Sequence, residues 1–178
     1  WGNRKHETII DLPDMLNRTI SLMRFSKTFA WTGCRAGYIN SGPELMHYIS
    51  NVPIGICGVP VPFQKAAVTA LTNGWDFVKE MREEYKKRID YMVPRLNEIE
   101  GVNCPYPEGA FYLFPKVEGL TTSGLMLIRD MMMKVQLLLA PGELYGENGT
   151  GHIRFSLVKP INVLEEAANR FEKYLKSQ

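Results

Sequence analysis

The spacing of apolar residues divides the chain into a strand-bearing start, a helical middle and a mixed end. Ile20 and Leu22 alternate with polar residues and predict a short strand that leads into Lys27. After a turn of small residues, residues 35–40 predict another short, buried strand. Residues 43–49 then predict a short helix with proline in its first turn.

The middle of the chain has the periodicity of helices. Apolar residues recur three and four positions apart between residues 77 and 92, which predicts a long helix within the helical region 63–98. A shorter apolar face around Ala66 and Ala70 predicts another helix before it, and Asn73-Gly74 should separate the two.

From Gly101 onward, the predicted elements alternate between strands and helices. The predicted strands cover residues 110–114, 135–140 and 152–158, and the predicted helices cover residues 123–133 and 161–175. Together they form an α+β layer that is large enough to close a modest hydrophobic core.

The composition is that of an ordinary globular chain and excludes several classes of protein. Of 178 residues, 45% are hydrophobic and 22% are charged, and the net charge of +2 is too small to indicate a nucleic-acid partner. Charged residues interrupt the most apolar stretch, residues 125–140, so neither a membrane span nor a membrane partner is predicted. Cys34, Cys57 and Cys104 are widely spaced and odd in number, which indicates neither a disulfide framework nor a metal site. We therefore expect a cytoplasmic protein.

The segment that begins at Phe25 carries the candidate chemistry. Lys27 follows a predicted strand and lies between Phe25 and Phe29, and partial desolvation would favour its neutral, nucleophilic amine. Such a lysine can form a Schiff base with a carbonyl compound. Arg35 offers a planar donor fork that suits a phosphate group, and Ser26 offers a hydroxyl nearby. A single lysine in a polar turn is more often a plain surface residue, so the prediction depends on the joint pattern.

This segment resembles a known signature. Ser26-Lys27-Thr28-Phe29-Ala30, followed by Thr32-Gly33 and Arg35, resembles the pyridoxal-phosphate attachment signature of the class I/II aminotransferases, which are fold-type-I pyridoxal-phosphate enzymes. Residues 108–115 are similar to a strand of the family's small domain, and residues 151–156 are similar to its closing element. The resemblance extends over essentially the whole chain.

The resemblance implies an α/β fold in three parts. Residues 1–60 would be the C-terminal remnant of the large cofactor-binding domain, residues 61–98 the interdomain helices, and residues 99–178 an α+β small C-terminal domain. Family members are much longer than this chain, so we expect it to be a C-terminal portion of such a protein.

The resemblance also assigns roles to individual residues. Lys27 would attach pyridoxal 5'-phosphate as a Schiff base and would move a proton after the substrate displaces it. Arg35 and Ser26 would bind the phosphate of this cofactor. Arg154 would bind the α-carboxylate of the substrate, because a bidentate guanidinium suits a carboxylate better than an ammonium does.

Two further residues are singled out by the resemblance. Gly142 would provide a turn with a close backbone approach beneath the strand of Arg154. Arg24 stands where family members commonly have a small hydroxyl residue that contacts the phosphate. It would either replace that contact with a positive charge or point away.

The resemblance implies amino-group transfer from an amino acid to a 2-oxo acid, and a homodimer when the protein is full length. The acidic partner of the pyridine nitrogen is expected outside this chain, so the chain alone should be inactive. The alternative enzyme is a fold-type-I β-lyase that cleaves carbon–sulfur bonds. The alternative outside catalysis is a binding or regulatory module that retains the fold.

Overall fold

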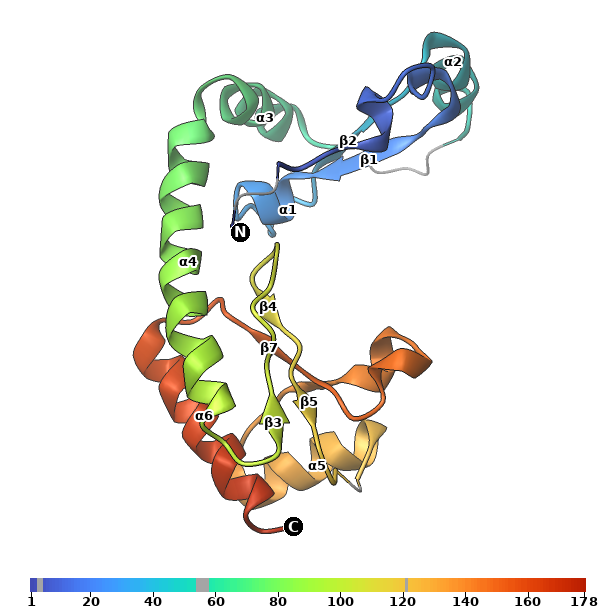
Figure 1. Ribbon diagram of the computed structural model, residues 1–178. Coiled ribbons are helices and arrows are strands. Elements are labelled where there is room, and N and C mark those ends of the chain that lie inside the picture. The colour runs from blue at the N-terminus through green and yellow to red at the C-terminus, as the bar shows by residue number, and fades with distance from the viewer. Residues whose placement is uncertain (3–4, 54–57, 121) are drawn as a thin grey trace. The chain divides into compact units, whose positions relative to one another are not determined.

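The computed structural model describes residues 1–2, 5–53, 58–120 and 122–178 (Figure 1). The chain divides into two compact units. The hairpin unit comprises Lys5–Met81, and the core unit comprises Arg82–Gln178 with the first residues of the chain. This division falls inside one long helix, whereas the sequence places boundaries after residues 60 and 98.

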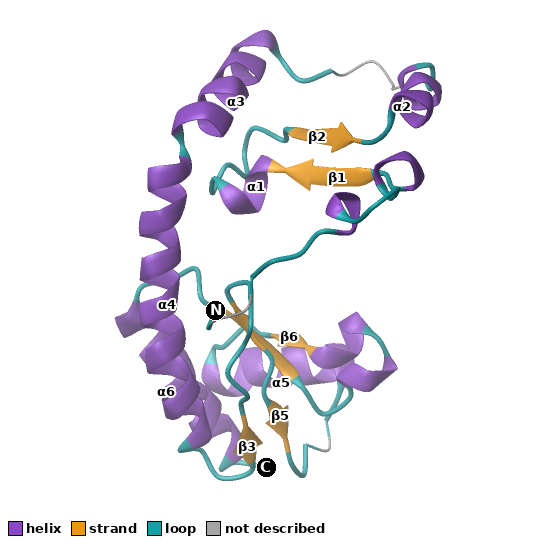
Figure 2. Ribbon diagram, turned by 45° about the horizontal axis from the view of Figure 1, so that its top comes forward, coloured by secondary structure: helices purple, strands orange, loops and turns teal. Residues whose placement is uncertain are grey.

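The hairpin unit is built around two antiparallel strands. β1 (Ser21–Arg24) pairs with β2 (Gly37–Asn40), and Arg24 lies opposite Gly37. Figure 2 shows the short helix α1 (Phe25–Thr28) at the end of β1. The unit also contains the 3-10 turns η1 (Ile9–Asp11) and η2 (Leu16–Arg18) and the helices α2 (Pro43–Ser50) and α3 (Val61–Asn73).

β2 is not the buried strand that the sequence predicts. All of its residues are exposed, and Leu22 on β1 is 71% exposed. In the described part of the chain, β1 and β2 form a sheet of their own, which no further strand extends. The prediction of burial is therefore wrong for this unit, because an apolar run becomes buried only where another layer covers it.

The long helix α4 (Trp75–Asn97) confirms the predicted apolar periodicity. Gly74 separates it from α3, as predicted, and the helix continues past Pro94. Ile89 and Met92 are completely buried. The C-terminal part of α4 therefore supplies one wall of the core unit.

The core unit contains a three-stranded antiparallel sheet with the order β4-β7-β6. A second strand pair, β3 with β5, and two helices complete it. The strands are β3 (Val102–Asn103), β4 (Tyr112–Leu113), β5 (Lys116–Val117), β6 (Ala140–Pro141) and β7 (Ile153–Ser156); the helices are α5 (Gly124–Val135) and α6 (Ile161–Leu175); the 3-10 turns are η3 (Gly142–Tyr145) and η4 (Glu147–Gly149).

The predicted strand over residues 135–140 is wrong for most of its length. α5 extends to Val135, and Gln136 ends it in the left-handed conformation with φ 53°. β6 begins only at Ala140, where Arg154 of β7 offers a partner. Leu137 is buried all the same, so its apolar character reflects packing in the core and not strand pairing.

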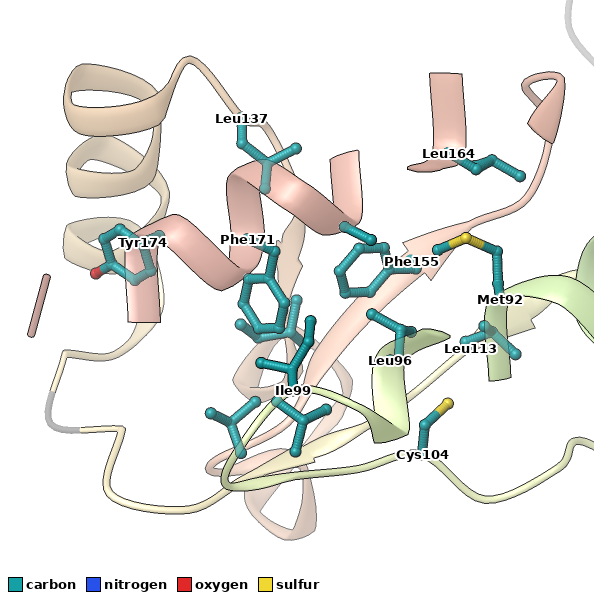
Figure 3. Packing of buried hydrophobic residues seen from close by; sticks show 14 of the residues in the cluster. Met92, Leu96, Ile99, Cys104, Leu113, Leu137, Phe155, Leu164, Phe171 and Tyr174 are labelled. Atoms are coloured by element: carbon teal, nitrogen blue, oxygen red, sulfur yellow. The ribbon is translucent and has the colours of Figure 1, made fainter. Parts of the chain in front are cut away.

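One hydrophobic core joins the helices and the sheet of the core unit. The rings of Phe155 and Phe171 lie 5.3 Å apart at 76°, and Figure 3 shows them beside Leu96. Burial of each such side chain contributes roughly 1.5–3 kcal/mol. On β7, Ile153 and Phe155 point into this core, so Arg154 projects from the opposite face of the strand.

Among the described residues, no helix is both long enough and apolar enough to cross a membrane. Cys34 and Cys104 are free thiols, and Cys57 lies outside the described residues.

Candidate active site

Lys27 lies on α1, a single helical turn that is tied to both strands of the hairpin. The Phe25 N–H donates to the Ala36 carbonyl at 3.3 Å, which connects the turn to the residue before β2. The N–H groups of Phe29 and Trp31 both donate to the Phe25 carbonyl, at 3.1 and 3.3 Å. These bonds close the backbone around Lys27 and define where its side chain starts.

Aromatic rings pack around Phe25, the first residue of α1. Phe25 is buried, and the rings of Phe29, Trp31 and Tyr38 lie within 5.8 Å of it, from centroid to centroid. The Phe29 ring also contacts Trp75 at 5.5 Å. Such aromatic pairs are worth about 0.5–1.5 kcal/mol each beyond the area they bury. These contacts stabilise the position of α1 within the hairpin unit.

The Lys27 side chain itself is exposed within this unit. Its expected desolvation by Phe25 and Phe29 is wrong for this unit, because the two rings pack against each other at 5.7 Å and against other aromatic residues.

A hollow of about 240 Å³ is lined by residues of β1, α1 and β2 and of the loop before β2. We call it the cationic hollow, because Arg24 and Arg35 both line it, together with the half-buried Ser26. Its complete lining is Leu22, Met23, Arg24, Ser26, Arg35, Ala36, Gly37, Tyr38 and Ile39. Arg24 therefore borders the same hollow as Ser26 and Arg35, the residues that are predicted to bind the phosphate.

Arg35 reaches the cationic hollow from an uncommon backbone conformation. Its φ is 49°, and Ala30 in the same loop has φ 52°, so two residues other than glycine occupy the left-handed region. The guanidinium Nη1 of Arg35 donates to the Thr32 carbonyl at 3.3 Å. Backbone strain from such positive φ values is common in loops that hold a side chain in one position.

Arg154 lies on β7 in the core unit, opposite Ala140 of β6. Its guanidinium carbon lies 4.7 Å from the centroid of the Tyr112 ring and 5.0 Å from that of Tyr145. Its Nε is buried and has no hydrogen-bond partner. Within the described ranges, the ion pairs join other residues, so Arg154 keeps its positive charge uncompensated.

Gly142 makes the close backbone approach that the sequence predicts. Its N–H donates to the His152 carbonyl at 2.8 Å, next to the start of β7. A Cβ at this position would lie 2.0 Å from the carbonyl oxygen of Gly149, so no larger residue fits without displacement.

Lys27, Ser26 and Arg35 all belong to the hairpin unit, where Ser26 and Arg35 line the cationic hollow, whereas Arg154 belongs to the core unit. Sequence reasoning missed both tyrosines that contact Arg154. Tyr112 meets Arg154 through the register of β4 on β7, and Tyr145 meets it through the turn that begins at Gly142, so neither contact has a signal in the local sequence.

A lysine on a tight turn, two arginines beside it and an uncompensated arginine on a second sheet suit a protein that binds two anionic groups. The family model for class I and II aminotransferases matches residues 2–171. The chain belongs to the class I and II aminotransferase family. The predictions of this family and of its mixed α/β fold are therefore confirmed.

Individual relatives support the same assignment. The chain is 37% identical to an aspartate aminotransferase of Pyrococcus abyssi, over 100% of this chain and 46% of that protein. It is 36% identical to an aromatic-amino-acid aminotransferase of Thermococcus litoralis, over 98% of this chain and 45% of that protein. A solved aromatic aminotransferase of Pyrococcus horikoshii superposes with a TM-score of 0.85 at 33% identity, over 99% of this chain and 48% of that one. The chain spans about half the length of the curated relatives it matches.

Proposed function

We propose that the chain acts as part of a pyridoxal-phosphate-dependent aminotransferase, which moves an amino group from an amino acid to a 2-oxo acid. The observation that carries this proposal is the cationic hollow, which collects Arg24, Ser26 and Arg35 beside the turn of Lys27. A phosphate dianion needs donors of this kind, and a charge-assisted hydrogen bond from a guanidinium is among the strongest available.

The residues of the hairpin unit fit the phosphate end of the cofactor. Two arginines and one serine line the same hollow, and its volume of about 240 Å³ exceeds what a phosphate group requires. When bound, pyridoxal phosphate supplies an electron sink next to the carbon atom that loses its proton. The chain supplies the groups that hold the cofactor and move the proton.

Lys27 has two tasks in this proposal. Its Nζ would hold the cofactor through the carbonyl carbon, and whenever Nζ is free it would carry a proton to or from the substrate. Arg154 has a separate task, because its uncompensated guanidinium can donate two hydrogen bonds to the substrate α-carboxylate. The domain assignments of residues 1–60, 61–98 and 99–178 belong to the same proposal.

Borohydride reduction of the cofactor-loaded, natural full-length protein tests the role of Lys27. Reduction makes the lysine–cofactor bond permanent, and trypsin does not cleave after the modified lysine. The pyridoxyl label should therefore appear on the tryptic peptide of residues 25–35. Lys27→Gln should abolish the label, whereas Lys65→Gln, a change at another exposed lysine of the unit, should not. A label on the peptide of residues 36–79 would assign the cofactor to Lys65 and contradict the proposal.

Product analysis separates the two enzyme classes. With a panel of amino acids and 2-oxoglutarate, an aminotransferase forms glutamate and the matching 2-oxo acid. A carbon–sulfur β-lyase would instead release a thiol, ammonia and pyruvate from a cysteine conjugate. Formation of these products without glutamate would overturn the proposed reaction.

The proposal extends to the setting of the protein. We propose a cytoplasmic homodimer, in accordance with the free thiols Cys34 and Cys104 and with the exposed apolar residues of the hairpin unit. Sedimentation of the full-length protein measures the oligomeric state, and a monomer at micromolar concentration would contradict this part.

A further inference from the structure

Among the described residues, aromatic rings and not an acidic residue contact the side chain of Arg154. Both contacts of its guanidinium carbon, at 4.7 Å from the Tyr112 ring and 5.0 Å from the Tyr145 ring, are within cation–π range. We call these two residues the tyrosine pair. An arginine this close to a carboxylate would instead be neutralised and would have its donors occupied.

Tyr145 reaches Arg154 from a short loop with a narrow neck. Gly142 and Gly149 form that neck, and a Cβ on either glycine would lie 2.0 Å from the carbonyl oxygen of the other. The Tyr145 ring meets the Phe114 ring edge-on at 5.9 Å, and Phe114 in turn stacks on His152 at 4.9 Å and 12°. The loop and the rings behind Tyr145 therefore restrict where it can lie, although Tyr145 is 51% exposed.

Tyr112 reaches Arg154 along the sheet. It pairs with Ser156 on β7, which places it on the same face as Arg154 and diagonal to it. The Tyr112 ring also packs on Phe111 at 4.6 Å. The Phe111 ring in turn stacks on Tyr85 of α4, with 4.8 Å between the centroids and 17° between the planes. Tyr112 is thereby connected through Phe111 to α4.

We infer that the tyrosine pair positions Arg154 for the carboxylate of the substrate. A cation–π contact uses the flat face of the guanidinium, so its N–H groups, which lie in the plane, remain available for a bidentate partner. The buried, unpartnered Nε of Arg154 shows that one such donor is still unused. This inference rests on the proposed function and adds Tyr145 and Tyr112 as positioning residues.

Steady-state kinetics of the cofactor-loaded, full-length protein tests the inference. Tyr145→Leu removes the ring and should raise the KM of the preferred amino acid by roughly 3- to 30-fold, the range that corresponds to one cation–π contact. The kcat should change little, because the contact acts equally on bound substrate and transition state. Tyr145→Phe keeps the ring and should retain the KM of the parent within about twofold. Tyr112→Leu and Tyr112→Phe should repeat this contrast.

The control is Tyr48→Leu, a change at a 64% exposed tyrosine of α2, which should leave KM unaltered. The dissociation constant of pyridoxal phosphate, measured on each apo variant, should match that of the parent.

If Tyr145→Phe raises KM as much as Tyr145→Leu does, or if both leave it unchanged, the ring does not position Arg154. If the parent protein transaminates no amino acid, the proposed function and this inference both fail. If it transaminates and Arg154→Lys raises KM while Tyr145→Leu does not, only the inference fails.

Discussion

Gly142 and Gly149 face each other so closely that neither position has room for a side chain. A Cβ on Gly142 would lie 2.0 Å from the Gly149 carbonyl oxygen and 2.8 Å from the His152 carbonyl oxygen. All of these obstructing atoms belong to the backbone, which cannot rotate away as a flexible side chain does. The contact therefore sets the width of the loop that carries Tyr145.

Gly142→Ala should consequently destabilise the core unit by roughly 1–3 kcal/mol, the cost of forcing extra volume into a packed site. Denaturant unfolding followed by circular dichroism measures this loss. Gly58→Ala is the matched control, because a Cβ there would meet no atom within 4 Å. Equal stability of the two variants would mean that the neck widens without cost.

Arg154→Lys should weaken substrate binding in the full-length enzyme. A lysine keeps the charge but loses the planar fork, so we expect a loss of about 1–3 kcal/mol in binding both the amino acid and the 2-oxo acid. Cofactor binding should persist, since the proposed phosphate contacts come from Arg24, Ser26 and Arg35. Unchanged kcat/KM for both substrates would remove Arg154 from the site.

Arg24→Gln should weaken binding of the cofactor through its phosphate group. Arg24 is an exposed residue, so we expect a loss of about 1 to 2 kcal/mol, toward the lower end for a charged hydrogen bond. Pyridoxal without its phosphate should bind the variant and the parent equally. Arg18→Gln, at an exposed arginine outside the cationic hollow, serves as the control in the same titration. Equal losses for pyridoxal and pyridoxal phosphate would contradict a phosphate contact.

Acid should destabilise the core unit through Glu172. Hydrogen bonds from Lys176 at 2.7 Å and from Arg95 at 2.6 Å lower the pKa of Glu172 from its ordinary value of 4.5 to about 2. The unfolded chain therefore binds the proton first, and the stabilisation is present above pH 4.5 and disappears as the pH falls toward 2.

Thermal unfolding between pH 5 and pH 2 measures this dependence. Glu172→Gln should flatten the decline of the Tm across that window, whereas Glu83→Gln, at an exposed carboxylate of α4, should leave it as steep as in the parent. A decline that both variants share with the parent would show that other carboxylates are responsible.

The helices of the core unit were predictable from the sequence because their apolar residues follow one period. Residues 161–175 were predicted as a helix, and α6 covers Ile161–Leu175 with Leu164, Ala168, Phe171 and Tyr174 buried. Strand burial was not predictable in the same way. The apolar residues of β1 and β2 indicate a strand pair, but whether a strand is buried depends on what packs against it, and the exposed Leu22 shows the difference.

The part of the candidate site that lies in one short segment could be proposed from the sequence. Lys27, Ser26 and Arg35 lie within ten residues of one another, so their proximity follows from the chain itself. The tyrosine pair was not predictable, because Tyr112 and Tyr145 meet Arg154 only through strand register and through a loop neck of two glycines. Contacts that depend on register between distant strands leave no local pattern.

The contact between Arg154 and the tyrosine pair also makes this part of the molecule a natural optical probe. Two phenol chromophores lie about 5 Å from an uncompensated positive charge, so their electronic transitions depend on its field. A carboxylate that binds Arg154 cancels much of this field, which should alter the tyrosine band of the near-ultraviolet circular dichroism. This ligand-induced change should be absent in the double variant that carries both Tyr145→Leu and Tyr112→Leu. Ligands could then be ranked by titration of the unlabelled protein, without turnover and at any wavelength that the cofactor leaves transparent.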